Sequence, residues 1–234
     1  MDQDDIDECT PRKFSFSYSA VKNFETCPRR YFETSVAMPR VWVEPPSPYL
    51  REGNELHGAF AHALRNNSPL PDSYAIHGRW LEKVRGIEGK LLVEERLAIT
   101  RDFDPCYWSN DKAWYRVIID AAVINTEKEW GLCIDWKTGK SANVSDNLQL
   151  TLTALTLFVH YPQIRAVGCR YVWLKEGMQT KHLVKYESIG DEWQRILPRV
   201  AQLEKAHRDK HFPPKPNHFC KNWCPVQSCQ YWGK

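Results

Sequence analysis

The chain has 234 residues, of which 42% are hydrophobic and 26% are charged, the balance of an ordinary globular protein that is long enough to bury a core. Its net charge of +3 and isoelectric point of about 8.4 allow nucleic-acid binding without requiring it, because the placement of charges matters more than their sum. No apolar run approaches the roughly 20 residues that span a bilayer, and the acidic start lacks a secretory signal, so we expect a cytoplasmic protein without a membrane span. The polar residues 1–13 are expected to form a flexible tail, and residues 14–234 a single domain.

The first predicted element is a helix that starts near Ser17, in SYSAVKNFETCPRRYFETSV. Apolar and aromatic side chains recur there at helical spacing, and serine is a favourable N-cap. Pro28 predicts a break in this helix just after Cys27. Residues 38–50 follow, and their four prolines predict a loop.

A second helix is predicted over GNELHGAFAHALRNN, where Leu56, Phe60 and Leu64 share one face. His57 lies at the edge of that face. The run KLLVEERLAI, at residues 90–99, ends with the alternation of a strand.

The centre of the chain carries the clearest strand pattern. WYRVIIDAAVI and GLCIDWKTG are both β-rich runs, and the polar turn NTEKEW joins them, so we expect two neighbouring strands. DNLQLTLTALTLFVHY then predicts a helix, VGCRYVWL predicts a strand followed by a turn at Lys175–Gly177, and DEWQRILPRVAQLEKAHRD predicts a last helix. This order predicts an α/β fold with a mixed central sheet flanked by helices.

Charged residues end both central strands. Asp120 closes one apolar run, Asp135 closes the other, and Lys137 follows two residues later. The period of two in a strand puts Asp135 and Lys137 on one face and Trp136 on the other. If the two strands are neighbours, Asp120 meets Asp135 across them, and two carboxylates and an ammonium group converge on one small volume.

That set of groups suits the hydrolysis of a phosphodiester bond. Paired carboxylates hold Mg²⁺ or Mn²⁺, and the ion lowers the pKa of a bound water and offsets charge on the scissile phosphate. A nearby lysine orients the water or stabilises the transition state. The alternative interpretation of the tripeptide D-x-K, taken alone, is a surface salt bridge at a hairpin.

The eight cysteines are unevenly placed. Cys220, Cys224 and Cys229 form a C-x3-C-x4-C cluster, and Cys27 supplies a fourth thiol near the other end of the chain. Disulfides are disfavoured without a secretory signal, so the clustering favours a metal centre. A zinc site and packed, unligated cysteines both stay open on this spacing. Cys133 alternates with strand positions and is expected in the core.

These motifs resemble those of the PD-(D/E)xK nuclease superfamily, in its RecB-like branch. IDWKTGK resembles the D-x-K-T-G motif, VIIDAAVI resembles the strand before it, and ELHGAF resembles the upstream helix that carries a histidine metal ligand. NLQLTLTAL resembles the helix with the Q-x-x-x-Y motif, and VEERL at residues 93–97 resembles a weaker family feature. The resemblance runs from about residue 14 to the end and implies a restriction-endonuclease-like core.

The resemblance also implies the roles of individual residues. The implied catalytic residues are Asp120, Asp135, Lys137 and Gln149. The implied metal ligands are His57, Asp120, Asp135 and the backbone carbonyl of Trp136. The resemblance implies that Glu94 lies near this site. Position 153 is Thr where the family motif has Tyr, which leaves open the DNA contact that the aromatic residue makes. Without the motif order, His57 would be interpreted as a packed or capping histidine and Gln149 as a solvated helix residue.

The segment ETCPRRYF resembles the C-P-R-R-Y/F element of RecB-like nucleases that carry an iron–sulfur cluster, such as CRISPR-associated RecB-like exonucleases and AddB-type subunits. This implies a [4Fe–4S] cluster held by Cys27, Cys220, Cys224 and Cys229. The cluster lobe would be formed by about residues 14–36 and 212–234. Zinc is the less favoured alternative. Arg29, Arg30 and Lys140 are candidate contacts to DNA phosphates, or equally a solvated basic face.

The expected function is Mg²⁺- or Mn²⁺-dependent hydrolysis of DNA. The resemblance favours an exonuclease acting on single-stranded DNA or DNA ends, in recombination, repair, phage or CRISPR-related processing. One alternative is a catalytically silent DNA-end-binding or scaffold subunit of a larger helicase or integrase complex. Another is a subunit that is active only with a helicase, annealing or integrase partner. An oligomer is compatible with the sequence.

Overall fold

The computed structural model of the protein describes residues 14–37, 48–141 and 146–234. The expected tail at residues 1–13 and the larger part of the expected loop at 38–50 lie outside the described residues. Within the described ranges, no helix is both long enough and apolar enough to cross a membrane.

The first helix begins and breaks where the sequence predicts. α1 (Tyr18–Thr26) has Ser17 as its N-cap, whose side chain accepts a hydrogen bond from the Ala20 N–H. Cys27 has extended backbone angles, and a second short helix, α2 (Pro28–Tyr31), follows with Pro28 in its first turn. A π-helical turn, η1 (Phe32–Val36), completes this N-terminal layer.

Helix α3 (Pro48–Asn66) is longer than predicted, because the predicted loop does not extend to residue 50. Pro48 is its first residue, and proline is tolerated there since the N–H that it lacks has no partner inside the helix. Leu56, Phe60 and Leu64 are buried, as their spacing predicts. A 3₁₀ turn, η2 (Asp72–His77), and α4 (Gly78–Arg85) follow and pack beside α3.

Six strands form one mixed sheet in the order β2-β1-β3-β4-β5-β6. Their bounds are β1 (Lys90–Ile99), β2 (Pro105–Cys106), β3 (Tyr115–Asn125), β4 (Trp130–Lys137), β5 (Ala166–Trp173) and β6 (Met178–Lys185). The β4–β5 pair is parallel and every other pair is antiparallel. The mixed central sheet predicted from the sequence is therefore confirmed, but β2 and β6 are strands that the sequence patterns do not predict.

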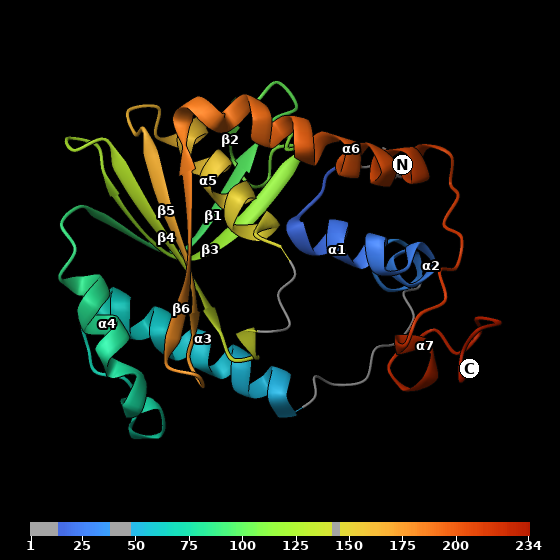
Figure 1. Cartoon of the computed structure of the whole chain (residues 1–234), viewed down its shortest axis with the longest axis horizontal. Helices are drawn as coiled ribbons and strands as arrows, with labels where there is room; N and C mark the ends of the chain where they lie inside the picture. The colour runs from blue at the N-terminus through green and yellow to red at the C-terminus, as the bar shows by residue number, and fades with distance from the viewer. Residues whose placement is uncertain (1–13, 38–47, 142–145) are drawn as a thin grey trace, which may run out of the picture.

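Helices cover the two faces of the sheet (Figure 1). α5 (Leu148–His160) and α6 (Ile189–Arg208), with the 3₁₀ turn η4 (Tyr186–Ser188) between β6 and α6, lie on one face, and α3 and α4 lie on the other. α5 crosses behind β4 and β5 and is apolar around most of its circumference, because it is packed between the sheet and α6. This arrangement is the α/β layer architecture that the element order predicts.

The two ends of the described chain meet outside the sheet. α7 (Phe219–Asn222) and the C-terminal segment lie beside α2, away from the strands (Figure 1). Aromatic contacts tie this region to the domain: Phe212 stacks on Phe32, with ring centroids 4.8 Å apart, and Tyr31 hydrogen-bonds His207 of α6 at 2.9 Å.

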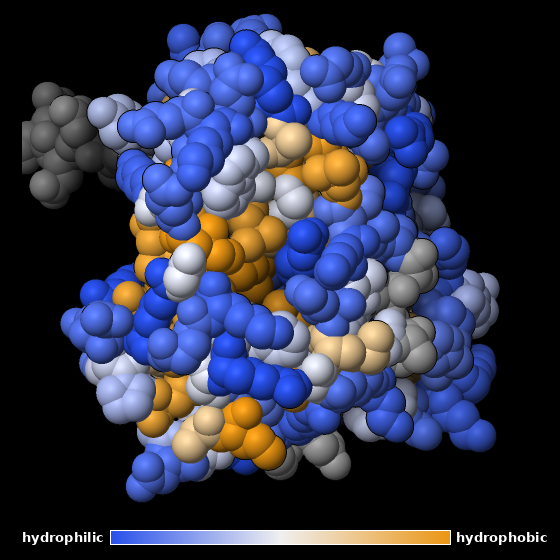
Figure 2. Space-filling view, turned by 60° about the vertical axis from the view of Figure 1, so that its left-hand side comes forward, coloured by the Kyte–Doolittle hydropathy of each residue, from blue (hydrophilic) through white to orange (hydrophobic). Residues whose placement is uncertain are grey.

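Apolar side chains also reach the surface in one area. Figure 2, which brings the α4 side of the molecule forward, shows an apolar patch surrounded by hydrophilic side chains. The large exposed apolar residues include Leu91 of β1 and Leu183 of the edge strand β6. Exposed apolar residues are normal on a protein surface, so we assign no function to them.

Candidate active site

The site lies where strands β3 and β4 part. Their pairing runs from Asn125 opposite Trp130 to Ala121 opposite Ile134 and then ends, although both strands continue. Asp120 and Asp135 are the first residues beyond the last pair. The two residues at this fork in the sheet therefore lie on neighbouring strands, as predicted, and the charge of Asp120 contributes to the raised pKa of Asp135.

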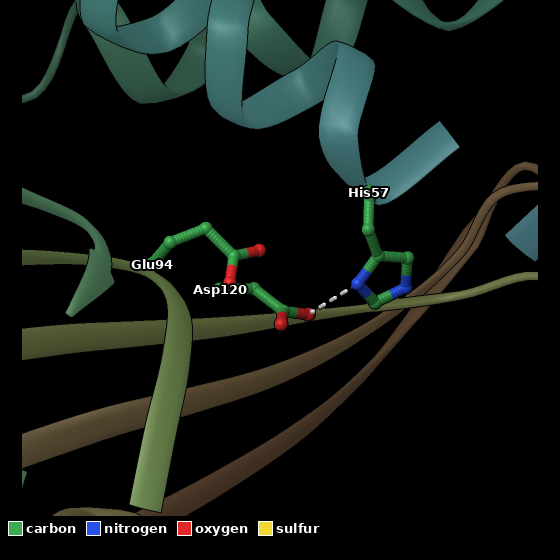
Figure 3. A group of neighbouring side chains, drawn as sticks. All are labelled: His57, Glu94 and Asp120. Carbon is green, nitrogen blue, oxygen red and sulfur yellow. Dashed lines mark ion pairs between the residues drawn. The ribbon is translucent and has the colours of Figure 1, made fainter. Parts of the chain in front are cut away.

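On the α3 side of the fork, three potential metal ligands converge. His57 of α3, Glu94 of β1 and Asp120 of β3 each offer one ligand atom, and these atoms all lie within 4.8 Å of one another. Figure 3 shows the His57 ring directed from its helix toward Asp120, with the Glu94 carboxylate on the other side of Asp120. His57 Nδ1 and Asp120 Oδ2 are 3.3 Å apart. One imidazole and two carboxylates are a donor set suited to a divalent ion.

Glu94 reaches the cluster through an unusual backbone. Val93 pairs with Ala121 and Glu95 with Ile119, so Glu94 is level with Asp120 on the neighbouring strand. Its φ is +49°, in the left-handed region that non-glycine residues rarely adopt. The left-handed residue interrupts the alternation of β1: Leu92 packs in the α5-side core, Val93 packs against the α3-side core, and Leu97 returns to the α5 side. A strained residue at this point is typical of a functional site.

On the α5 side of the fork, Asp135, Lys137 and Gln149 form a second cluster. Lys137 Nζ lies 2.8 Å from Asp135 Oδ2 and donates to Gln149 Oε1 at 3.0 Å. The Gln149 amide in turn donates to Asp135 Oδ1. The prediction that Asp135 and Lys137 share one face of the strand is confirmed. Gln149 lies in the first turn of α5 and contacts both of them, so it is not a solvated helix residue.

The backbone of Trp136, which lies between Asp135 and Lys137 in the chain, contacts the His57–Asp120 cluster. Its backbone N–H donates to Asp120 Oδ2 at 2.9 Å, and its backbone also hydrogen-bonds the His57 ring. Its indole points the other way, 4.4 Å from the Phe60 ring between centroids, and is 2% exposed. The buried indole therefore fixes the peptide that contacts both Asp120 and His57.

The pKa values of His57, Glu94 and Asp135 are all raised by their surroundings. Burial lowers the pKa of His57, but the hydrogen bond to Asp120 and the charges of Asp120 and Asp135 outweigh it, so the pKa is raised. Burial and the Asp120 charge raise the pKa of Glu94. Burial raises the pKa of Asp135 to about 6, against the opposing effect of Lys137. All three groups therefore bind a proton more tightly than their ordinary values imply, as expected of groups that also bind a metal ion in competition with protons.

The departure from the Q-x-x-x-Y motif has a structural counterpart. Thr153 is 6% exposed, and its hydroxyl donates to the backbone carbonyl of Gln149 at 2.9 Å. A side chain turned back on its own helix is not directed into the fork. Two tyrosine hydroxyls are close enough to Asp135 and Asp146 to be affected by their charges. Burial and these charges raise the pKa of Tyr18, at the start of α1, to about 12, and they also raise the pKa of Tyr171.

The four predicted cluster cysteines line one small cavity. Cys27 contributes to it from the α1–α2 junction, and Cys220, Cys224 and Cys229 from the C-terminal segment. Two of the thiols accept backbone hydrogen bonds at 3.4 Å, Cys27 from Lys215 and Cys220 from Asn217. Within the described ranges, no three of these thiols have sulfur atoms within 4.8 Å of one another, the spacing that His57, Glu94 and Asp120 reach. Cys133 is buried in the core, as predicted.

The three predicted basic contacts lie apart from the carboxylates. Arg29 pairs with Glu33 at 2.5 Å, and the Arg30 guanidinium lies 5.8 Å from the Phe219 ring centroid. Both arginines line the cysteine cavity. Lys140 is exposed just beyond β4. The structure thus brings His57, Asp120, Asp135, Trp136, Lys137 and Gln149 to one site, and adds Glu94 to them.

Comparison with known proteins gives two positive findings. Residues 115–230 match the family model described as PD-(D/E)XK nuclease superfamily. The fold is similar to a crystal structure of a "putative exonuclease" from Eubacterium rectale, with a TM-score of 0.53 and 10% identity over 89% of this chain and 86% of that one. The protein SSO0001 aligns with a TM-score of 0.46 and 14% identity, over 96% and 90% of the two chains. No curated protein matches the chain significantly.

Proposed function

We propose that this chain, in which residues 115–230 match the family model described as PD-(D/E)XK nuclease superfamily, is a metal-dependent deoxyribonuclease that acts as an exonuclease on single-stranded DNA or DNA ends. The observation that carries the proposal is the fork between β3 and β4. It holds the ligand group His57, Glu94 and Asp120 on one side and the Asp135–Lys137–Gln149 cluster on the other. The name of the Eubacterium rectale protein supports the choice of an exonuclease.

The residues of the fork fit a divalent ion such as Mg²⁺ or Mn²⁺. The proposed ligands are His57, Asp120, Asp135 and the backbone carbonyl of Trp136, with Glu94 as a further oxygen ligand. The raised pKa values of His57, Glu94 and Asp135 support this assignment, since a bound cation would favour the deprotonated form of each group. A bound ion supplies Lewis acidity to a water and to the scissile phosphate.

Lys137 has a separate task in this proposal. Its ammonium is held between Asp135 and the amide oxygen of Gln149, so its direction is set by two acceptors rather than by solvent. An ammonium fixed beside a metal ligand orients a water molecule for attack on phosphorus and offsets the charge that develops on the phosphate oxygens. Gln149 is a positioning residue, because it contacts both Asp135 and Lys137.

Cleavage of end-labelled DNA tests the proposed activity. We expect anaerobically purified protein to degrade linear single strands with Mn²⁺ or Mg²⁺, to spare circular single strands of the same sequence, and to be silent in EDTA. Release of label from the 5′ or the 3′ end gives the polarity. Cleavage of circles at a similar rate would replace the exonuclease with an endonuclease. Metal-independent DNA binding without any cleavage would instead favour the scaffold subunit, or a subunit that needs a partner.

We further propose that Cys27, Cys220, Cys224 and Cys229 hold a [4Fe–4S] cluster. Four thiols from both ends of the domain line one cavity, which matches the ligand number of such a cluster. The backbone N–H groups of Lys215 and Asn217 already donate to two of these thiols, and such hydrogen bonds stabilise thiolates. A bound cluster would cross-link α2 to the C-terminal segment and so close a long loop across the whole domain.

Removal of one cavity thiol tests the cluster. Cys229→Ser is expected to abolish the broad visible absorption of anaerobically purified protein, to lower its iron and acid-labile sulfide content to near zero, and to reduce thermal stability by about 2–4 kcal/mol, the range typical of a lost cross-link. Cys106→Ser is the matched control, because Cys106 is a half-exposed cysteine in β2. One zinc ion per chain, without iron or sulfide, would replace the cluster with the zinc site.

A further inference from the structure

The fork in the sheet leaves one edge of β3 without a partner strand. β4 pairs with β3 only from Ala121 onward. Near the start of β3, the segment before α1 covers the edge: the Arg116 N–H donates to the Phe16 carbonyl at 3.0 Å. Between these two points a cleft of about 650 Å³ opens, with β3 on one side and the first turns of α1 on the other. Gln149 of the candidate active site also lines this cleft.

The cleft continues into the metal-ligand group. Ile118 lines both the cleft and a second hollow of about 630 Å³ that contains His57, Glu94 and Asp120. Its side chain is 45% exposed, which is unusual for isoleucine in the middle of a strand. A substrate strand that crosses Ile118 would therefore pass directly from the cleft to the candidate metal ligands.

The chemistry of the lining suits phosphate groups. Ser17, Ser19 and Asn23 supply hydroxyl and amide groups, and none of the lining residues is acidic. Arg116 is the lining residue with a cation, and its guanidinium donates to the backbone carbonyls of Trp108 and Asn110. No ion pair among the described residues includes Arg116.

One buried hydroxyl lies beside the cleft. Tyr115 lines the cleft and is fully buried as a residue, and within the described chain its hydroxyl has no hydrogen-bond partner. A buried hydroxyl without a partner is costly. The hydroxyl is also shielded from solvent, so it adds no contact to a ligand in the cleft.

Trp108 supplies an aromatic surface at the rim. It is half-buried in the loop between β2 and β3, and Arg116 fixes its backbone through the 2.9 Å hydrogen bond to its carbonyl. The Arg96 guanidinium lies 5.8 Å from its ring centroid. Arg96 is the cross-strand partner of Ile118 and is exposed. Proteins that bind single strands stack unpaired bases on aromatic rings that lie beside cationic side chains. Trp108, with Arg96 and Arg116 beside it, has these features.

We propose that this cleft binds an unpaired nucleic-acid strand, with one base stacked on Trp108 and the neighbouring phosphates held by Arg116 and by the first turn of α1. The inference rests on the proposed nuclease function for the identity of the adjoining site. It specifies the substrate as single-stranded, because in a duplex the bases are stacked on one another and cannot present a face to Trp108. A cleft of this volume encloses a small ligand and not a duplex.

Binding measured without catalysis tests the cleft. Fluorescence anisotropy of a labelled oligothymidylate in EDTA is expected to show about tenfold weaker binding by Trp108→Ala, with Trp108→Phe restoring most of the affinity. Tyr107→Ala is the matched control: Tyr107 is the adjacent aromatic residue, is 85% exposed and does not line the cleft. Its affinity should equal that of the wild type.

A second variant separates phosphate binding from folding. Ser19 is exposed in the first turn of α1, where an acidic residue stabilises the helix but repels phosphate. Ser19→Asp should therefore melt no lower than the wild type and bind the oligonucleotide several-fold more weakly. A paired duplex of equal length should bind at least tenfold more weakly than the single strand and should be insensitive to Trp108→Ala.

The outcomes distinguish this inference from the proposed activity. Unchanged single-strand affinity in both Trp108→Ala and Ser19→Asp, or duplex binding as tight as single-strand binding, would overturn the inference even if the wild-type protein cleaves DNA. If both variants lose affinity while the wild-type protein cleaves nothing with any metal, the cleft stands and the nuclease proposal fails.

Discussion

Asp120→Asn is expected to lower the rate of DNA cleavage on the order of 10³-fold or more while leaving the protein folded. Asp120 is the carboxylate at the centre of the fork: it contacts His57 Nδ1 at 3.3 Å, accepts the Trp136 N–H at 2.9 Å and lies level with Glu94. Asparagine keeps an oxygen that accepts the Trp136 N–H. It removes the negative charge that a divalent ion requires, so the loss falls on metal binding and catalysis and not on the strand fork.

Initial rates on end-labelled single strands across a Mn²⁺ titration, together with thermal melts in EDTA, measure both parts of this prediction. Glu127→Gln is the control, since it removes one carboxylate from the exposed turn between β3 and β4. It should leave the rate within about twofold of the wild type, as surface substitutions generally do. A cleavage rate for Asp120→Asn equal to that of the control would rule out Asp120 as a metal ligand.

Metal ions are expected to stabilise the fold strongly at pH 7.5 and weakly at pH 5.5. Asp135 has a pKa of about 6 in the folded, metal-free protein against an ordinary value of 3.8, so the folded state binds the extra proton. Its contribution to the free energy of unfolding is therefore most favourable at low pH and falls as pH rises from about 4 through 6. The full fall is about 3 kcal/mol, from the two pKa values.

His57 acts in the same direction at higher pH. Its pKa is raised in the folded state, so its contribution is present below its ordinary value of 6.5 and is lost as pH rises through the raised value. Both protons must leave before His57 and Asp135 can bind a metal ion. A metal at 100 times its dissociation constant should then add about 2.7 kcal/mol to the free energy of unfolding at pH 7.5, and much less at pH 5.5.

Urea unfolding at pH 4.5, 5.5, 6.5 and 7.5, with EDTA or with saturating Mn²⁺, checks this linkage. Asp135→Asn provides the comparison, because it cannot take up the proton. In EDTA the wild type should lose about 2 kcal/mol more than the variant between pH 4.5 and pH 7.5, because part of the full change lies below pH 4.5. Parallel pH curves for the two proteins would show that Asp135 has an ordinary pKa, and a metal effect independent of pH would place the ion on other ligands.

The candidate site residues on the two central strands could be predicted from the sequence because of strand alternation. Asp120 and Asp135 end two apolar runs, and a charged group at the end of a buried strand needs a partner. The two-residue period puts Lys137 beside Asp135, and the structure confirms their contact at 2.8 Å. The break after Cys27 was equally predictable, because proline restricts the backbone locally.

Other features escaped prediction because they have no local signal. β6 is an edge strand in which Val184 is the buried residue, so it lacks the apolar alternation by which strands are recognised. The end of the predicted loop was wrong at Pro48, because the same proline that ends a helix is also tolerated in its first turn. The resemblance at VEERL implied that Glu94 lies near the site, but its left-handed backbone has no local signal, because it depends on the strands around it.

The sequence by itself determined which side chains could do chemistry and on which element each would lie, because residue type and periodicity are local properties. Only the tertiary structure decided that β3 and β4 part at Ala121 and Ile134, that the ligand atoms of Glu94, His57 and Asp120 lie within 4.8 Å of one another, and that a cleft without acidic residues opens beside Gln149. These features depend on where strand pairing stops and on which helix packs over the gap. Both are outcomes of long-range packing, in which residues far apart in the chain compete for the same hydrogen bonds and the same core.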